Sequence, residues 1–362
     1  MSTQPRSSRW SAGPWPTGGR CLSRSCGGRR SGSARAVSRH EWRGRPLCAP
    51  ALPPQCCRHR AEFRRWHVGR GGRYVRRPNH VAVADIWRSR GGEMIILAIS
   101  NQKGGVGKTT TTQHMAAVLG AEHHSRVLAV DLDPQFNLTK AAGVDVDHLT
   151  ASVYQVLVTQ AATLRDVIQP TEQGYDIAPA DPRLGSADIE LVSAGRVNWH
   201  LALRKALATL GGSYDWVLLD CPPALGTLTV NALHAAHGVV IPVTPELWPI
   251  SGMQLLFGAI QVASAEGNPG LEVLAAIPTM VRRGKPHTGM LERMQTVFEG
   301  VPIGPSVMLS DHFQSAALAG TTVIHRSPSS AAAASYRNVT EFVVRAVEAR
   351  QRRPATRILV GA

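Results

Sequence analysis

Eight residues, Lys103 to Thr110 with the sequence K-G-G-V-G-K-T-T, have the types and spacing of a phosphate-binding loop. They follow the apolar run Met94–Ser100, which predicts a buried strand. Glycines in such a turn let backbone N–H groups approach a phosphate, and the positive N-terminal end of the following helix favours the same anion. The residues that we expect to line this site are Lys103, Gly104, Gly105, Val106, Gly107, Lys108, Thr109 and Thr110.

Three of these side chains have chemistry of their own. The Lys108 ammonium would reach the β- and γ-phosphates of a nucleotide as a flexible point charge. The Thr109 hydroxyl would complete the coordination of Mg²⁺, and Thr110 would open the helix beside the α-phosphate. The loop alone therefore predicts a nucleotide site with a magnesium ion.

The loop departs from the generic pattern at two neighbouring positions. A generic phosphate loop has glycine where this chain has Gln102, and the next residue is a second lysine, Lys103. In these residues the chain resembles the ParA/MinD family of deviant Walker A ATPases, and within it the ParA/Soj-type partition ATPases. The resemblance implies ATP and Mg²⁺ as ligands, and a sandwich homodimer in which Lys103 touches the partner's nucleotide. The alternative is that Lys103 is only a solvated loop residue.

Two acidic segments follow apolar runs that predict parallel strands. Val127–Val130 runs into Asp131-Leu132-Asp133-Pro134-Gln135, and Trp216–Leu219 runs into Asp220-Cys221-Pro222-Pro223. Ligands of open α/β sheets bind at the carboxyl ends of the strands, so both segments are expected beside the loop.

The resemblance gives these carboxylates roles. Asp133 matches the switch residue that positions the attacking water, which with Lys108 and Lys103 makes up the expected catalytic set. Its alternative role is to cap the turn before Pro134. Asp220 matches the Walker B acid that holds Mg²⁺ through a water. Thr279 and Met280, after the expected strand Glu272–Pro278, match a segment near the nucleotide, and we expect adenine contacts there.

Alternating strand and helix patterns predict the fold. Helical patterns cover Thr109–His123, Leu184–Leu210, Leu255–Glu266, Pro286–Phe298 and Ala331–Gln351, and Tyr175–Ala178 is predicted to be an extended segment. The family resemblance adds a helix over Leu228–Leu233 and a strand over Val239–Glu246. The expected class is an α/β, doubly wound, mostly parallel sheet of the P-loop NTPase type. We expect one domain over residues 94–353 and a tail over residues 354–362.

Composition divides the chain in two. The whole chain has a formal charge of +15, but residues 1–93 hold 20 Arg, no Lys and four acids, so they carry +16 and the remainder carries −1. The same 93 residues hold five of the six cysteines and five of the eight tryptophans, without periodicity. We expect them to be a disordered, Arg-rich extension that buries no core.

Three origins of this extension can be considered, and the first two fit its composition poorly, because basic arms usually mix Lys with Arg and rarely carry so many Trp and Cys. It could be a basic arm that grips DNA, or a transit peptide, which is rich in Arg and Ser and poor in acids. Arginine without lysine, mixed with Trp, Cys, Gly and Pro, is also what GC-rich DNA yields when translated outside a reading frame. Met94 stands where chains of the resembled family begin, and our hypothesis is that translation starts there.

The resemblance implies a partition-type activity. ATP closes the dimer, the dimer binds DNA without sequence preference, and a centromere-binding (ParB-type) partner or cargo adaptor stimulates hydrolysis, which segregates plasmid, chromosome or mobile-element DNA. The basic cluster Arg282, Arg283 and Lys285 is the expected DNA contact. Leu309 and His312 stand where familiar chromosomal members carry arginines, so the DNA face could instead involve the C-terminal bases, which are Arg345, Arg350, Arg352 and Arg353. The expected location is the bacterial cytoplasm, at the nucleoid.

Other functions fit less well. A related ATPase could position a protein cargo, which the sequence does not distinguish from DNA segregation. A membrane-surface ATPase of the cell-division (MinD-like) type needs an amphipathic C-terminal helix, and Ile358-Leu359-Val360 is too short, so no membrane partner is expected. Iron–sulfur reductases of this fold need several cysteine ligands, and the chain after Met94 has only Cys221.

Overall fold

The computed structural model describes residues 93–193, 197–244, 250–282, 289 and 294–352, together with the short segments 66–68 and 74–76. By internal contacts the chain divides into residues 1–66 and 67–362. The strands β1 (Trp66–Val68) and β2 (Tyr74–Arg76) pair in a two-stranded sheet. The hypotheses about the remainder of residues 1–93 lie outside the described residues, as do Arg283, Lys285, Arg353 and the tail.

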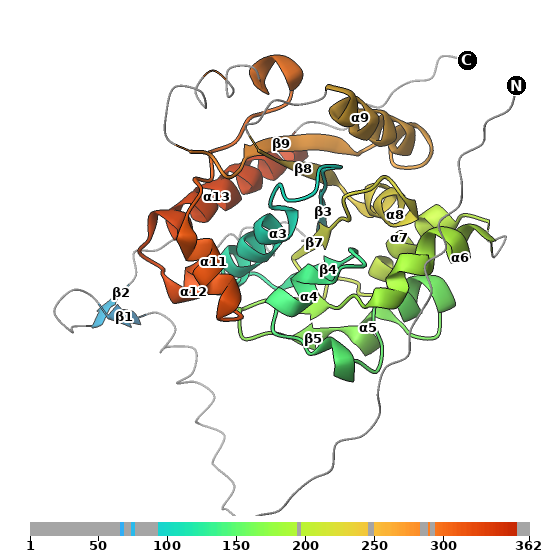
Figure 1. The fold of residues 1–362 in the computed structure, drawn as a ribbon, viewed down its shortest axis with the longest axis horizontal. Helices are drawn as coiled ribbons and strands as arrows, with labels where there is room; N and C mark the ends of the chain where they lie inside the picture. Colours follow the sequence, from blue (N-terminus) through green and yellow to red (C-terminus); the bar gives the residue numbers. More distant parts are fainter. Residues whose placement is uncertain are drawn as a thin grey trace, which may run out of the picture. The chain divides into compact units, whose positions relative to one another are not determined.

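A seven-stranded sheet with the order β5-β6-β4-β7-β3-β8-β9 forms the centre of the second unit (Figure 1). The strands β6, β4, β7, β3, β8 and β9 are parallel, and only β5 is antiparallel to its neighbour. The bounds are β3 Ile95–Ile99, β4 Val127–Asp131, β5 Gln169–Pro170, β6 Asp176–Ala178, β7 Trp216–Asp220, β8 Gly238–Val243 and β9 Glu272–Pro278. The prediction of an α/β, mostly parallel sheet is confirmed.

Helices cover both faces of this sheet because its strands are apolar on both sides. Along β3, Ile95, Leu97 and Ile99 face one layer, whereas Ile96 and Ala98 face the other. The first layer is built from α3 Lys108–Ala117, α4 Asn137–Ala141, α11 Asp311–Leu318, α12 Val323–Arg326 and α13 Ala331–Arg352 (Figure 1). The second is built from α5 Leu164–Val167, α6 Ala187–Ser193, α7 Ala202–Ala208, α8 Thr227–Ala235 and α9 Ile250–Ala265.

Several predicted elements match closely. The predicted helix Ala331–Gln351 corresponds to α13, and the predicted strand Glu272–Pro278 has the bounds of β9. The predicted helix Leu255–Glu266 is longer than expected, since α9 begins at Ile250. Of the predicted helix Pro286–Phe298, residues 294–297 are helical and most of the remainder lies outside the described residues.

Two helix predictions were wrong in extent. Leu184–Leu210 is not one helix, because it is divided into a 3₁₀ turn Pro182–Ser186, α6, a second 3₁₀ turn Trp199–Leu201 and α7. Asn198, just before the second turn, has φ +66°, which a right-handed helix cannot accommodate. Thr109–His123 also changes character, since α3 ends at Ala117 and a π-helical turn, Val118–Glu122, follows. Gly120 in that turn lies against Gly174, where a Cβ atom would collide with the Gly174 carbonyl.

Candidate nucleotide and magnesium site

The phosphate loop lies between β3 and α3 in the conformation that its glycines permit. Gly105 and Gly107 have φ +73° and +84°, values that other residues rarely adopt. A Cβ atom built on Gly104 or Gly105 would meet no described atom within 4 Å, so the outer side of the loop is open. Because α3 begins at Lys108, directly after Gly107, its free N–H groups and positive end lie at the loop. The loop is therefore shaped to receive an anion.

Neighbouring strands fix the loop in place. The Asn101 side chain donates to the Pro242 carbonyl at 2.7 Å and accepts from the Lys103 N–H at 3.0 Å, which ties the start of the loop to β8. The Thr279 hydroxyl donates to the Val106 carbonyl at 2.7 Å, which ties the loop to the end of β9. Our sequence reasoning missed Asn101. Its only signal was an amide at the end of a predicted strand.

Thr279 and Met280, expected from the sequence to be near the nucleotide, lie against the phosphate loop. Met280 has φ +54°, and its Cε atom would lie 3.8 Å from a Cβ atom on Gly107. The Thr279 hydroxyl already donates its proton to the Val106 carbonyl, so its role is to hold the loop in place. A contact of either residue with adenine stays a prediction.

The two loop lysines have different surroundings. Lys108 is buried, and its Nζ donates to the Lys103 carbonyl at 3.3 Å. Burial lowers the pKa of Lys108, and the carboxylate of Asp220 opposes that shift. Lys103 is exposed, and its Nζ donates to the Thr244 hydroxyl at 3.4 Å. Lys108 thus faces inward toward the carboxylates, whereas Lys103 is accessible from outside.

Asp220 has the environment of a cation ligand. It is fully buried at the end of β7, and its Oδ1 accepts from the Thr112 hydroxyl at 3.4 Å. Its Oδ2 has no hydrogen-bond partner among the described residues. Burial, followed by the nearby Asp131 carboxylate, raises the pKa of Asp220 well above its usual range, and the Thr109 hydroxyl opposes the shift. An unpartnered buried oxygen beside a threonine hydroxyl is the donor set that Mg²⁺ prefers, so these residues fit the ion.

Asp131, the last residue of β4, and Asp133, two residues later, have different roles. Asp131 is fully buried and accepts from the N–H and hydroxyl of Thr139, at 2.9 and 2.7 Å. It also accepts from the Asp133 N–H at 3.1 Å, so Asp131 holds the turn that presents Asp133. Burial raises the pKa of Asp131 to about 6. Sequence reasoning gave Asp131 no role, because nothing in the D-L-D spacing shows which carboxylate points into the protein.

Asp133 caps the turn before Pro134, as the alternative interpretation expected, and it also lies near the charged side chains of the site. Its Oδ1 accepts from the Gln135 N–H at 2.9 Å, which caps the turn at Pro134. It nevertheless lies close enough to Lys108 and Asp220 to act on both pKa values. The structure therefore brings Lys108, Asp133 and Asp220 together at the carboxyl edge of the sheet.

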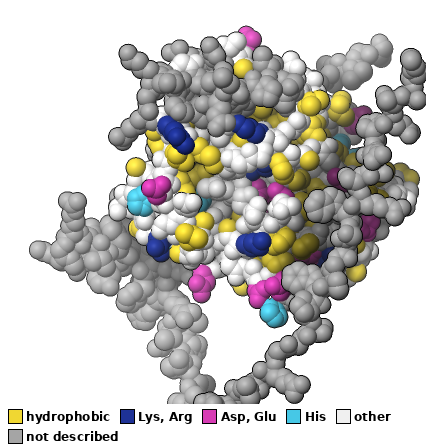
Figure 2. Space-filling model, in the orientation of Figure 1, with side chains coloured by type: hydrophobic (Ala, Val, Ile, Leu, Met, Phe, Trp, Pro, Cys, Tyr) yellow, Lys and Arg dark blue, Asp and Glu magenta, His cyan; other side chains and the backbone are white. Residues whose placement is uncertain are grey.

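The basic residues expected to bind DNA do not form a single patch among the described residues. Arg282 is exposed, and the other two members of its cluster lie outside the described residues. The described C-terminal arginines form ion pairs, Arg345 with Glu341, Arg350 with Glu272 and Arg352 with Glu348. On the face drawn in Figure 2, Lys and Arg side chains of the described residues are scattered singly.

Within the described part of the chain, no helix is long and apolar enough to cross a membrane. The same residues contain no cluster of three or more His, Cys, Asp or Glu side chains that could hold a metal by themselves. A magnesium ion at Asp220 would therefore need oxygen atoms from the nucleotide and water in addition to the protein.

Comparisons with known proteins agree with this geometry. Residues 94–273 match a family model described as an AAA domain. The chain is 38% identical over 253 residues to the chromosome-partitioning ATPase Soj of Thermus thermophilus, covering 70% of this chain and 96% of that protein. It is 41% identical to the chromosome partitioning protein ParA of Myxococcus xanthus over 186 residues, 51% of this chain, and spans 64% of that relative's length. A solved structure described as cobyrinic acid a,c-diamide synthase of Mycobacterium smegmatis, with bound ADP and magnesium, is 33% identical with a TM-score of 0.62, covering 71% of this chain and 96% of that one.

Proposed function

The chain belongs to the ParA/Soj family of chromosome-partitioning ATPases, and on that basis we propose that it is an ATP-driven switch that segregates DNA. In the proposed cycle, MgATP closes a homodimer, the dimer binds DNA without sequence preference, and a ParB-type partner triggers hydrolysis and release. The observation that carries this proposal is the meeting of Lys108, Asp133 and Asp220 at one edge of the sheet.

Nucleotide binding is assigned to the loop. The N–H groups of Gly104 to Thr110 would surround the phosphates, and Lys108 would neutralise their charge from inside the protein. Thr109 and Asp220 would hold Mg²⁺, consistent with the unpartnered Oδ2 of Asp220. When bound, the ion supplies charge neutralisation between the phosphate oxygens.

Hydrolysis is assigned to positioning rather than to a covalent nucleophile. A water oxygen forms a bond to the γ-phosphorus, the bond to the bridging oxygen breaks, and ADP and inorganic phosphate leave, with one water proton kept on the phosphate and the other released to solvent. Asp133 would orient that water, because its turn is fixed by Asp131 and by its own bond to the Gln135 N–H. Lys108 would stabilise the charge that develops on the phosphate oxygens as ADP departs.

Dimerisation is assigned to Lys103. Its side chain is exposed and donates to the Thr244 hydroxyl at 3.4 Å, whereas Lys108 is buried. A lysine on the open side of the loop can reach a nucleotide held by a second copy of the chain. That copy would complete the charge around the phosphates, so closure would depend on ATP.

Binding of the dimer to random-sequence duplex DNA tests the proposal. The full chain would be titrated with DNA in the presence of MgATP or MgADP across a salt series, with Lys108→Ala as a matched control. The extension carries +16 and can bind DNA regardless of nucleotide, so the informative quantity is the difference between ATP and ADP.

We expect binding that is tighter with ATP, steeply weakened by salt, and insensitive to nucleotide in the Lys108→Ala control. Equal DNA affinity with ATP and ADP, in protein that still dimerises with ATP, would overturn the DNA-binding step and favour a protein cargo. Absence of ATP binding would overturn the assignment of the site itself.

A further inference from the structure

His114, on the helix that follows the phosphate loop, is buried among the C-terminal helices of the same layer. Its side chain is only 2% exposed. The ring stacks on Tyr336 of α13 with centroids 4.8 Å apart, and meets Phe313 of α11 edge-on at 5.4 Å. One imidazole thus contacts two helices that are distant from α3 in sequence.

Both ring nitrogens of His114 have partners, and these partners define its protonation. Nδ1 lies 2.8 Å from the Thr110 carbonyl oxygen, which can only accept, so Nδ1 carries the proton. Nε2 accepts from the backbone N–H of Val323, the first residue of α12, at 3.1 Å. Only the neutral Nδ1–H form can make both bonds. The imidazole therefore joins the first turn of α3 to the first turn of α12.

Two other residues of α3, Thr111 and Gln113, also connect this helix to the C-terminal part of the layer. The Thr111 hydroxyl lies 3.2 Å from the Tyr336 hydroxyl. Gln113 donates to Gln173 at 2.9 Å, and Gln173 donates to the Gly320 carbonyl, just after α11, at 3.0 Å. Polar groups buried in this way are costly to separate, so α3 and the C-terminal helices are expected to move together.

We propose that His114 is a positioning residue that couples the nucleotide state of the phosphate loop to the surface formed by α11 and α12. Thr110 belongs both to the loop that would contact the α-phosphate and to the bond with His114. A change in the first turn of α3 on nucleotide binding is therefore transmitted through the ring to Val323. The inference rests on nucleotide binding at the loop, as proposed above.

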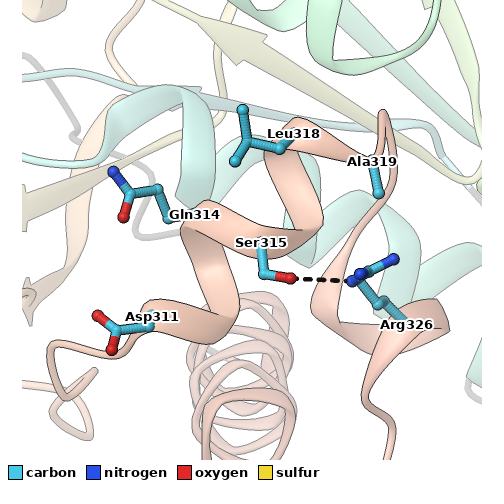
Figure 3. Close-up of a pocket in the computed structure, with 6 residues that line it drawn as sticks. All are labelled: Asp311, Gln314, Ser315, Leu318, Ala319 and Arg326. Carbon is cyan, nitrogen blue, oxygen red and sulfur yellow. Dashed lines mark hydrogen bonds between the residues drawn. The ribbon is translucent and has the colours of Figure 1, made fainter.

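The surface formed by α11 and α12 is expected to change shape when α12 is displaced. α11 and α12 border a depression lined by Asp311, Gln314, Ser315, Leu318, Ala319 and Arg326 (Figure 3). Arg326 of α12 donates to the Ser315 hydroxyl of α11 at 3.0 Å, so displacement of α12 would alter the depression. Leu318 is 88% exposed there, which makes the surface accessible to solvent and to a probe.

Amide hydrogen exchange of the full chain, with and without a non-hydrolysable ATP analogue and Mg²⁺, tests the coupling. Two variants form a matched pair. His114→Asn keeps an amide near the Nδ1 position, so it can donate to Thr110 but has no acceptor for Val323. His114→Gln can place its carbonyl oxygen near the Nε2 position and keep the Val323 bond, but it has no donor near the Nδ1 position for Thr110. Because residue 114 itself lies on α3, the Val323 bond alone still joins α3 to α12 in this variant.

In the wild type we expect the analogue to slow exchange both in residues 103–110 and in residues 311–326, the latter by about fivefold or more. His114→Gln should retain the distant response, whereas His114→Asn should keep the loop response and lose the distant one. A merely structural role would change basal exchange equally with and without nucleotide. Loss of basal protection in both variants to the same extent, with the nucleotide response intact, would therefore overturn the proposal.

Other outcomes are separable. Slower exchange at the loop without any response at residues 311–326 of the wild type overturns the coupling but leaves nucleotide binding intact. No response at the loop overturns the proposed function instead. If His114→Asn does not fold, nitrogen chemical shifts of the wild-type imidazole decide the matter, because a ring protonated at Nε2 could not accept from Val323 and would contradict the connection.

Discussion

Asp131 and Asp220 stand opposite each other in register at the ends of β4 and β7, yet only Asp131 accepts hydrogen bonds at both oxygens. Both carboxyls are fully buried. Because both are equally buried, the difference in hydrogen bonding indicates different roles. Asp131 holds the structure of the site, whereas Asp220 keeps an oxygen for a ligand. This difference has a direct experimental consequence.

We expect Asp131→Asn to lower the free energy of unfolding by about 2–4 kcal/mol, because its amide NH₂ replaces one of the two accepting oxygens and leaves the donors of either Thr139 or Asp133 without an acceptor. Asp220→Asn should change it by only about 1 kcal/mol, but should remove the dependence of ATP affinity on Mg²⁺. Urea unfolding and nucleotide titration with and without magnesium measure the two effects. A large stability loss in Asp220→Asn, with magnesium dependence retained, would reverse these assignments.

Lys108→Ala should weaken ATP binding by roughly tenfold to a hundredfold, as expected for loss of a charge-assisted contact. It should not lower the melting temperature, because burial already disfavours the ammonium, as its lowered pKa indicates. Calorimetric titration and thermal unfolding give the two values, with exposed Lys205→Gln as a control. ATP-dependent dimerisation of Lys108→Ala would contradict the role of this lysine.

The strands and the site edge could be predicted from sequence because each buried strand is a short apolar run that ends at a polar residue. Loop glycines and the acids at 133 and 220 follow from such local patterns. Register across strands is not local, so the pairing of Asp131 with Asp220 was not foreseen.

Long-range hydrogen bonds were missed for the same reason. Asn101 acts on Pro242, and His114 acts on Val323, each across more than a hundred residues. The single helix expected over Leu184–Leu210 failed because apolar spacing does not reveal a left-handed residue such as Asn198.

Asp133→Ala should still bind ATP and dimerise, while turnover falls by about a hundredfold or more because the attacking water loses its positioning group. Stability should fall by about 1 kcal/mol, since the Gln135 N–H loses its acceptor. Asp145→Ala is a matched control, because Asp145 caps an exposed turn through the Asp147 N–H in the same way. Phosphate release measured in single-turnover experiments should be slow only in the first variant. Equal rates in both variants would leave Asp133 with the capping role alone.

Lys103→Gln should separate binding from dimerisation. ATP affinity of the monomer should stay within about twofold, whereas the ATP-dependent dimer should weaken tenfold or more, which corresponds to about 1.4 kcal/mol. Analytical ultracentrifugation with a non-hydrolysable analogue measures the dimer, and Lys205→Gln on α7 provides a control at an exposed lysine. An unchanged dimer constant would show that Lys103 is only a solvated residue.

The pKa of His114 predicts how stability depends on pH. Burial lowers that pKa from 6.5 to about 4, with His325 as a further lowering influence. The unfolded chain therefore binds a proton more readily than the native protein between these values, and the stabilisation present above pH 6.5 is lost as the pH falls toward 4. Between pH 7 and pH 5 the loss should be about 2 kcal/mol from this group. His114→Gln has no such proton to bind, so urea unfolding at both pH values should show a decrease smaller by that amount than in the wild type. Identical decreases in the two proteins would mean that His114 titrates normally, and that its ring does not hold α3 to α12 in the neutral form.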